Sequence, residues 1–180
     1  MQMRIRIAVS EDAALLPPVE HSASRLFLQI PDLAGLPDEE NLSVEDHQRY
    51  IASGTEWVAE NANGELIGFL AAQIVSADLH LWEFAVRAGF QGRGIGRQMI
   101  NVAATFATER HLESLTLTTF ADVPWNALWY SRLGFEVVAD DARLAALVAA
   151  EVKRGLPRRC AMRRTLTPRE PTGASQHGRL

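Results

Sequence analysis

The order of hydrophobic patterns along the chain predicts a mixed α/β (α+β) fold. Strand patterns joined by tight turns dominate the first half, and strand–helix–strand units fill the second half. This order differs from that of an all-parallel doubly wound sheet or a barrel, in which strands and helices alternate throughout. The chain has 180 residues, of which 47% are hydrophobic, so it is long enough for one domain with its own core.

The first half begins with an alternating strand pattern and ends in a hairpin. The expected elements are a strand at 3–9, a helix that Ser10 caps and that runs to about Ile30, a loop at 31–41, a helix from Ser43 to about Ser53, and strands at 56–60 and 65–74. Asn61-Ala62-Asn63-Gly64 supplies the turn between the last two strands. Pro17 and Pro18 fall in the middle of the first expected helix, where proline removes a backbone donor.

The second half alternates strands with helices. The expected elements are a strand at 79–86, a glycine-rich segment at 91–97 that leads into a helix, a strand at 115–120, a helix at 126–133, a strand at 135–139, a helix at 143–154 and a strand at 160–166. Residues 167–180 show no periodic pattern and are expected to form a disordered tail. One domain at 1–166 is therefore expected.

Composition argues against several classes of protein. The net charge of −4 does not favour nucleic acid as a partner, because a basic face supplies most of that affinity. No apolar run reaches the roughly 18 residues of a membrane-spanning helix. A single cysteine, Cys160, allows no intramolecular disulfide, and the five histidines lack the spacing of metal ligands. We therefore expect a cytoplasmic protein with no metal site and no membrane or nucleic-acid partner.

The glycine-rich segment has the character of a phosphate-binding turn. The first turn of any helix leaves backbone N–H groups without partners, and the helix dipole attracts anions to that end. Glycines let phosphate oxygens approach these amides, and neighbouring arginines add positive charge. The segment reads Gln91-Gly92-Arg93-Gly94-Ile95-Gly96-Arg97. The sequence therefore predicts a pyrophosphate site at this strand-to-helix turn.

Two common pyrophosphate motifs do not fit this turn. The P-loop requires Gly-Lys-Ser/Thr, whereas here the chain reads Gly96-Arg97-Gln98. The dinucleotide fingerprint requires a third glycine where this chain has Met99. ATP and nicotinamide dinucleotides are therefore weaker candidates than other pyrophosphate ligands.

The spacing Gln91-x-x-Gly94-x-Gly96 resembles the central motif of the GNAT (GCN5-related N-acetyltransferase) family. A second segment, Asn126-x-x-x-Tyr130-x-x-x-Gly134-Phe135, resembles a later motif of the same family. The resemblance covers roughly residues 3–166 and is specific over 79–97 and 122–135. It implies a mostly antiparallel sheet of about seven strands, flanked by helices and splayed between the fourth and fifth strands. It also implies transfer of an acetyl group from acetyl-CoA (coenzyme A) to the amine of a small molecule, by direct attack in a ternary complex, and homodimers are common in the family.

The resemblance assigns roles to residues at matching positions. The strand at 79–86 would hold the acetyl carbonyl and the pantetheine arm through backbone groups, and Tyr130 would protonate the departing thiolate as general acid. The cofactor-binding residues that it implies are Phe84, Ala85, Val86, Gln91, Gly92, Arg93, Gly94, Ile95, Gly96, Arg97, Asn126 and Tyr130.

The base that removes the amine proton has two candidates, His80 and Glu83. Strict strand alternation would place His80 with Trp82 and Phe84 on one face and Glu83 on the other. The resemblance favours His80 slightly. The structural alternatives are a core histidine and a Glu83 paired with an arginine such as Arg87 or Arg97.

The acceptor site is less defined. The resemblance points to the first helical region, with Glu20, His21, Arg25, Phe27 and the acidic stretch Asp38-Glu39-Glu40, which alternatively form a solvated loop. Cys160 lacks a paired base and is not expected to act as a nucleophile. The alternative functions are an acyl-CoA-binding module without turnover, acetylation of a protein or peptide amine, and a nucleotide-binding protein.

Overall fold

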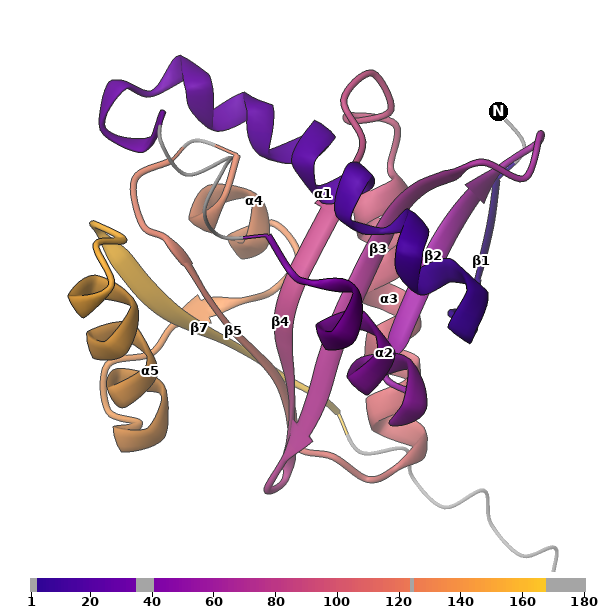
Figure 1. The fold of residues 1–180 in the computed structure, drawn as a ribbon. Coiled ribbons are helices and arrows are strands. Elements are labelled where there is room, and N and C mark those ends of the chain that lie inside the picture. Colours follow the sequence, from indigo (N-terminus) through magenta and orange to yellow (C-terminus); the bar gives the residue numbers. More distant parts are fainter. Residues whose placement is uncertain (1–2, 35–40, 124, 168–180) are drawn as a thin grey trace, which may run out of the picture.

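The computed structural model describes residues 3–34, 41–123 and 125–167. Over these residues the chain forms a seven-stranded sheet in the order β1-β2-β3-β4-β5-β7-β6 (Figure 1). The strands are β1 (Met3–Ile7), β2 (Glu56–Asn61), β3 (Leu66–Val75), β4 (Asp78–Val86), β5 (Ser114–Phe120), β6 (Glu136–Val137) and β7 (Arg159–Thr165). The described strands pair antiparallel except β4 and β5, which are parallel. The predicted fold class is thereby confirmed.

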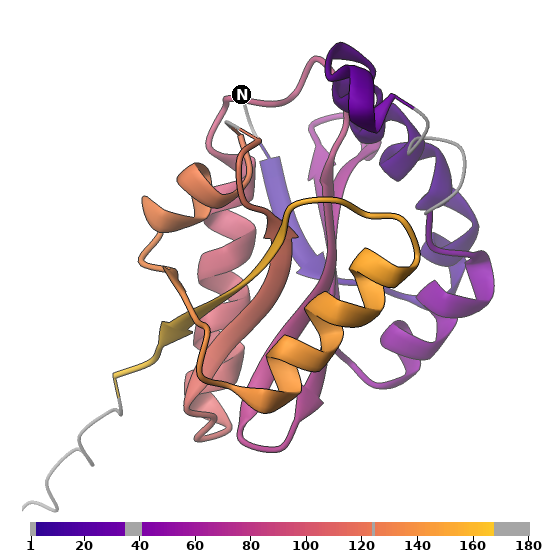
Figure 2. The same cartoon turned by 90° about the vertical axis from the view of Figure 1, so that its left-hand side faces the viewer.

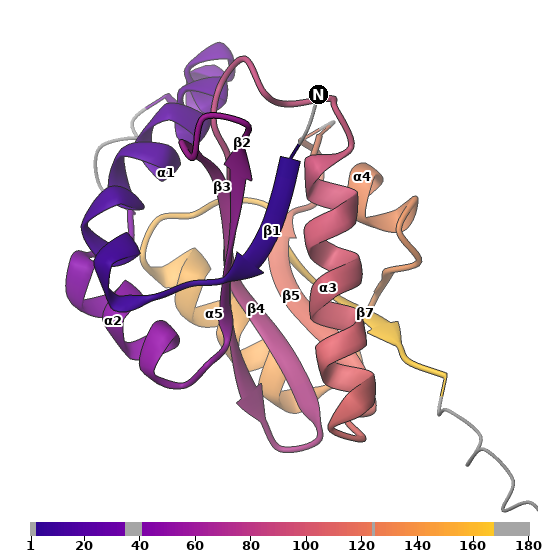
Figure 3. The ribbon, with the colours of Figure 1, turned by 90° about the vertical axis from the view of Figure 1, so that its right-hand side faces the viewer.

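Helices cover both faces of the sheet. The α-helices are α1 (Pro17–Ser24), α2 (Val44–Ala52), α3 (Ile95–Glu109), α4 (Ala127–Ser131) and α5 (Ala142–Lys153), and the short 3-10 helices are η1 (Ser10–Leu15), η2 (Arg25–Gln29) and η3 (Pro31–Leu33). Figures 2 and 3 show α1, α2 and α5 on one face and α3 and α4 on the other. The larger buried cluster lies beneath α3, and a second cluster lies beneath α1 and α2.

The single helix expected between Ser10 and Ile30 is wrong. The segment divides into η1, α1 and η2. Pro17 and Pro18 stand at the start of α1, where a proline without N–H loses no helical hydrogen bond. Ser10 is not the cap either, because the carboxylate of Asp12 accepts from the amide of Val9 at 2.8 Å. The prolines thus begin a helix rather than interrupt one.

Other boundaries differ by smaller amounts. The helix expected at 126–133 is shorter, because α4 ends at Ser131, and Gly134 then takes a φ of 86° that suits glycine. The strand expected at 135–139 is reduced to β6. The helix after Ser43 is confirmed as α2, with the Ser43 hydroxyl accepting from the amide of Asp46 at 3.1 Å. The tail at 168–180 and the acidic residues Asp38, Glu39 and Glu40 lie outside the described residues.

Among the residues that the structure describes, no helix is long and apolar enough to cross a membrane. The same residues contain no group of His, Cys, Asp and Glu side chains suited to a metal ion.

Candidate active site

The glycine-rich turn connects β4 to the longest helix, α3. Gly94 is the N-cap residue of α3 and has a φ of 81°, and Gly92 has a φ of 73°. A Cβ atom added at either glycine would meet no heavy atom within 4 Å, so the space above the turn is open. The first α3 backbone hydrogen bond is donated by Gln98 to the carbonyl of Gly94, and the preceding amides of the first turn have no partner within the helix. The turn therefore offers free N–H groups and room for an anion.

Two residues of the motif have structural roles that the sequence did not indicate. The side-chain amide of Gln91 donates to the carbonyl of Val86 at 2.9 Å and so ties the turn to the end of β4. A Cβ atom at Gly96 would lie 2.9 Å from both the Phe84 and Trp129 rings. These rings stack in parallel, with centroids 5.7 Å apart and an interplanar angle of 1°. Gly96 is therefore required for close packing of α3 on this aromatic pair.

The parallel strands β4 and β5 separate halfway along β4. Their pairing runs from Asp78 opposite Ser114 to Leu81 opposite Leu117 and stops there. The splay expected between the fourth and fifth strands is therefore present. The residues of β4 beyond Leu81 face β5 without a ladder between them.

Two backbone amides of β4 point into this splay. Arg87 donates to the carbonyl of Ile67 on β3 at 2.9 Å. Because successive N–H groups of a strand point to opposite sides, the amides of Phe84 and Val86 face away from β3. The Phe84 amide donates to the carboxylate Oε1 of Glu83 at 3.0 Å. These amides are the donors that the sequence analysis placed at the acetyl carbonyl and the pantetheine arm.

A β-bulge in β4 overturns the predicted placement of His80 and Glu83. Ala71 of β3 lies opposite Glu83 and Ala72 lies opposite Leu81, so Trp82 is an extra residue between them. A bulge reverses the alternation of side chains beyond it. Leu81 and Phe84 consequently pack in the cluster under α3, whereas Ala85 packs in the cluster under α1 and α2. His80 and Glu83 thus point to the same face, not to opposite faces.

His80 is enclosed in the closed part of the sheet. Its ring is 1% exposed, and Nδ1 lies 2.9 Å from the hydroxyl of Thr116 on β5. Burial, together with the positive charge of Arg143, lowers the pKa of His80 to about 4. The imidazole is therefore neutral at pH 7 and lies below the point where the strands part.

Glu83 lies where the strands have parted. Burial raises its pKa to about 7, and the Phe84 amide, Arg159 and His47 oppose that rise. Glu20 of α1 is 5% exposed, and its pKa is raised to about 9, first by burial and then by the charge of Glu83. Since Arg159 and His47 favour the ionised form of Glu83, this carboxyl ionises first and Glu20 keeps its proton at pH 7.

Tyr130 of α4 approaches Glu83 from the other side of the splay. Burial raises the pKa of its phenol above the ordinary value, and the charge of Glu83 raises it further. Its ring packs edge-on against Trp129 and Phe135, with centroids 4.9 and 5.5 Å away. Asn126 precedes α4 as the N-cap, and its carbonyl accepts from the amide of Tyr130 at 3.0 Å. Asn126 therefore places Tyr130 through the backbone.

An ion pair on the β5–β7 side of the splay was missed by the sequence analysis. Arg159 of β7 donates to Glu151 of α5 at 2.8 Å and to the hydroxyl of Thr118 of β5 at 3.2 Å. Both charged side chains are largely buried, with 11% and 13% exposed. The three residues lie on separate elements, so no local sequence pattern relates them. The charges of Arg159 and Glu151 both act on Glu83, and that of Arg159 also acts on Tyr130.

The residues expected at the acceptor site have different environments. Glu20 is buried and accepts from the amide of Leu42 at 2.9 Å. Phe27 of η2 packs on Phe120 and Trp125, with ring centroids 5.4 and 6.3 Å away. Arg25 is exposed. The Phe27 contacts place η2 against Phe120 at the end of β5 and against Trp125 just before α4. Glu20, in contrast, lies buried on α1.

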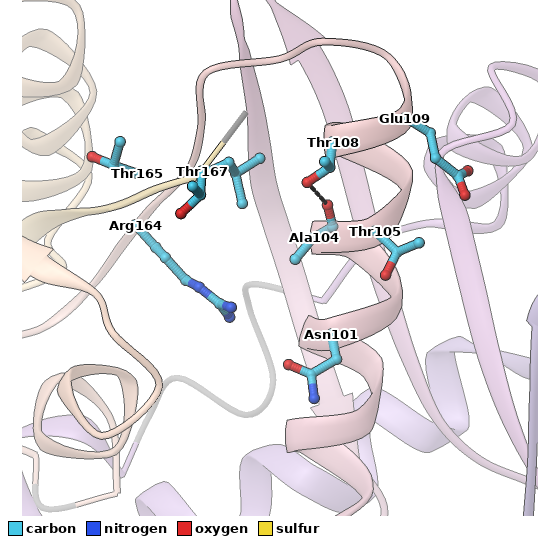
Figure 4. Close-up of a pocket in the computed structure, with 9 residues that line it drawn as sticks. Asn101, Ala104, Thr105, Thr108, Glu109, Arg164, Thr165 and Thr167 are labelled. Atoms are coloured by element: carbon cyan, nitrogen blue, oxygen red, sulfur yellow. Dashed lines mark hydrogen bonds between the residues drawn. The ribbon is translucent and has the colours of Figure 1, made fainter. Parts of the chain in front are cut away.

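A separate groove of about 360 Å³ lies beside the second half of α3 (Figure 4). Its lining residues are Asn101, Ala104, Thr105, Thr108, Glu109, Arg164, Thr165, Leu166 and Thr167. None of them is a residue that the sequence analysis placed in the site. The groove is therefore distinct from the splay.

Comparison with known proteins relates the central part of the chain to one family. The acetyltransferase (GNAT) domain family matches residues 52–137, which include β4, the glycine-rich turn, α3 and α4. The chain as a whole shares its fold with solved GNAT structures. Streptothricin acetyltransferase of Streptomyces lavendulae is 33% identical over 129 residues, which are 70% of this chain and 65% of that relative.

Solved GNAT structures share the fold over nearly the whole chain. PaiA N-acetyltransferase of Thermoplasma acidophilum, solved with coenzyme A, has a TM-score of 0.70 and 17% identity, and the match covers 92% of this chain and 99% of that one. Nourseothricin acetyltransferase has a TM-score of 0.63 and 20% identity, with 93% and 100% covered. The ribosomal-protein-S18-alanine N-acetyltransferase of Escherichia coli has a TM-score of 0.64 and 16% identity, with 96% and 99% covered. Their names include both antibiotic and protein acceptors, so the shared fold does not define the acceptor.

Proposed function

We propose that this protein transfers the acetyl group of acetyl-CoA to the amine of a small cationic molecule by direct attack. The observation that supports this best is the splay between β4 and β5. There, the amides of Phe84 and Val86 lie beside the glycine-rich turn, and Glu83 and Tyr130 approach from opposite sides. A donor at a carbonyl oxygen, a base and an acid are the three groups that acyl transfer to an amine requires.

The glycine-rich turn and the start of α3 fit the pyrophosphate of coenzyme A. The first-turn amides of α3 are free of helical partners, and Gly92 and Gly94 leave open space above them. Arg93 and Arg97 have exposed side chains that add positive charge beside this space. In this proposal Gln91 and Gly96 shape the turn, the first by its bond to Val86 and the second by its close packing.

Glu83 is the base in this proposal, in place of the slight preference for His80. Free alkyl amines titrate near about 10, so the acceptor arrives as an ammonium ion. A carboxyl with a pKa of about 7 accepts a proton readily at neutral pH. The Phe84 amide, which now binds Glu83, would instead donate to the acetyl carbonyl. Glu83 would then lose a bond that favours its ionised form and become a stronger base.

Tyr130 is the general acid. Burial and the neighbouring Glu83 keep its phenol protonated at neutral pH, so it can donate to the departing thiolate. We expect Tyr130→Phe to lower kcat by about 10²-fold, with KM for acetyl-CoA changed less than threefold, because the phenyl ring keeps the packing on Trp129 and Phe135. Steady-state kinetics measure both constants, and an unchanged kcat would remove Tyr130 from this role.

A cationic acceptor is consistent with the charges of the site. Glu83 carries the negative charge nearest the splay, and the Arg159–Glu151 pair adds no net charge. The streptothricin acetyltransferase of Streptomyces lavendulae is named for a small-molecule acceptor. We therefore propose an antibiotic-like amine of the streptothricin type as the first acceptor to test.

The deciding experiment is a thiol-release assay with acetyl-CoA and a panel of amines. The panel contains streptothricin, simple diamines, amino acids and peptides with free N-termini. Turnover of streptothricin or another small amine supports the proposal, and turnover of peptides alone would favour a protein acceptor. Tight acetyl-CoA binding without release of thiol from any amine would instead indicate a binding module.

A further inference from the structure

A buried histidine–glutamate pair lies behind the proposed base. His47 of α2 and Glu56 of β2 have fully buried side chains, and Nδ1 of His47 lies 2.6 Å from Oε1 of Glu56. This distance is that of a strong, charge-assisted hydrogen bond. The proposed mechanism does not use either residue.

The sheet register places this pair next to Glu83. Glu56 lies opposite Ala71 of β3, and Ala71 lies opposite Glu83 of β4. The three residues form one row on the face beneath α1 and α2, with the Cα atoms of the two glutamates roughly 10 Å apart. Because the side chain of Ala71 is small, a side chain from the helices that cover this face can enter the space between Glu56 and Glu83.

His47 occupies the layer above this row. Its ring packs edge-on against Phe69 of β3, with centroids 4.9 Å apart and an interplanar angle of 88°. Phe69 stands two residues before Ala71 and so shares its face. Since His47 bonds to Glu56 on β2 and packs on β3, its ring lies between Glu56 and the strand that carries Glu83.

One polar atom of each residue in the pair takes no part in the hydrogen bond between them. Nε2 of His47 and Oε2 of Glu56 are buried, and neither has a hydrogen-bond partner among the described residues. Buried polar atoms are nearly always bonded, so an unpartnered one requires an explanation. Transient bonding of Nε2 to a neighbouring group that moves during the reaction would supply that explanation.

We propose that the Glu56–His47 pair is a positioning pair for Glu83, and that the Nε2–H of a His47 imidazolium donates to the Glu83 carboxylate that removes the proton of the acceptor. In that step the ammonium N–H bond breaks and an O–H bond forms on Glu83. Solvent then takes up this proton, which returns Glu83 to its carboxylate form. The positive charge of the imidazolium is then balanced by the carboxylate of Glu56, which accepts from Nδ1.

The contact between Glu83 and the Phe84 amide provides the required movement. In this structure that amide holds the Glu83 carboxylate, and Nε2 has no bond to it. When the acetyl carbonyl takes the amide, the carboxylate is released and can turn toward His47, directly or through one bridging water. The inference thus rests on the proposed function of Glu83 as the base.

The test follows the titration of Glu83 itself by carboxyl ¹³C NMR, with the resonance assigned by Glu83→Gln. In His47→Gln and Glu56→Gln we expect the pKa of Glu83 to rise by roughly one pH unit, because an imidazolium that favours the ionised carboxyl is lost. Val58→Ala is the matched control, since Val58 is buried in the same layer without carrying charge.

The other titratable groups around Glu83 and the pair are Asp12 from η1, Glu20 from α1, Asp46 and Tyr50 from α2, Tyr130 from α4, Glu151 from α5 and Arg159 from β7.

Kinetics on the same variants give the second readout. In His47→Gln and Glu56→Gln we expect kcat at pH 7 to fall about tenfold, because less of Glu83 is ionised. We expect kcat to recover toward pH 9, where Glu83 is ionised again, with KM for acetyl-CoA within twofold of the parent. An unchanged Glu83 titration in both variants, or an equal change in Val58→Ala, would overturn the inference. Failure of the parent protein to acetylate any amine would overturn the proposed function instead, while the NMR titration would still decide the coupling.

Discussion

His80 and Glu83 stand three residues apart on β4 and point to the same face, yet their surroundings differ. His80 lies where β4 is paired with β5, bonds to Thr116 and has a pKa lowered to about 4. Glu83 lies beyond the end of that pairing and has a pKa raised to about 7. Burial disfavours the charged form in both, which makes the histidine a weaker base and the carboxylate a stronger base. The point at which β4 and β5 part therefore separates a buried, neutral histidine from a carboxyl whose pKa is close to neutral pH.

The largest expected effect tests this comparison directly. We expect Glu83→Gln to lower kcat/KM at pH 7 by about 10²–10³-fold, because a general base contributes a factor of this size. We expect His80→Gln, which keeps a hydrogen-bonding group near Thr116, to change kcat/KM less than threefold. Both variants are measured with acetyl-CoA and the best acceptor of the panel. A larger loss in His80→Gln than in Glu83→Gln would reverse the assignment of the base.

A second prediction concerns the packing that holds the open half of β4. Gly96→Ala places a Cβ atom 2.9 Å from the Phe84 and Trp129 rings, so the stacked pair must shift. Such overpacking costs about 1–3 kcal/mol, and we expect KM for acetyl-CoA to rise about tenfold as β4 and α3 move apart. Gly64→Ala is the control, because its φ of 77° makes it strained while its surroundings are open. It should lower Tm without changing KM, and equal KM values for both variants would contradict the packing role of Gly96.

The smallest expected effect on turnover concerns Glu20, the protonated neighbour of Glu83. Its folded pKa of about 9 lies above the ordinary 4.5, so the native state binds its proton more tightly than the unfolded chain does. This contribution to stability is fully present below pH 4.5 and is lost as the pH rises toward 9. We expect Glu20→Gln to be more stable than the parent at pH 9 by several kcal/mol, and about equal to it at pH 4.5.

Urea unfolding at the two pH values measures this difference. The kcat of Glu20→Gln at pH 7 should stay within twofold of the parent, because the proton is already on Glu20 at that pH. A stability gain that is independent of pH would mean that Glu20 is not protonated in the folded protein.

Local signals in the sequence predicted most of the fold. The hairpin turn at Asn61–Gly64, the Ser43 cap of α2 and the glycine-rich entry to α3 each depend on residues within a few positions of one another. The single helix expected at 10–30 was wrong because Pro17 and Pro18 were placed in its middle, whereas they start α1 after a separate 3-10 turn.

The site was only partly predictable, because some of its residues lie in continuous segments and others come from distant elements. The turn residues and Tyr130 lie in two continuous segments, and a spacing rule could find them. Arg159, Glu151 and His47 reach Glu83 from β7, α5 and α2, so their influence depends on how distant elements pack. The roles of Gln91 and Gly96 as supports of the turn also required the contacts with Val86, Phe84 and Trp129.

The sequence by itself indicated the resemblance to the GNAT family, the position of the candidate anion-binding turn and the two candidates for the base, because these depend on residue types at short spacing. Only the tertiary structure showed that His80 and Glu83 point to the same face of β4. The bulge at Trp82 that causes this arises from the pairing with β3, so the alternation of residues in the sequence does not reveal it. The tertiary structure also decided which candidate lies at the splay, because the end of the β4–β5 ladder is a property of two strands separated by a helix. The glycine-rich turn predicts a cofactor site from local chemistry, whereas the environment that shifts the pKa of Glu83 exists only once α1, α2, α5 and β7 have packed around it.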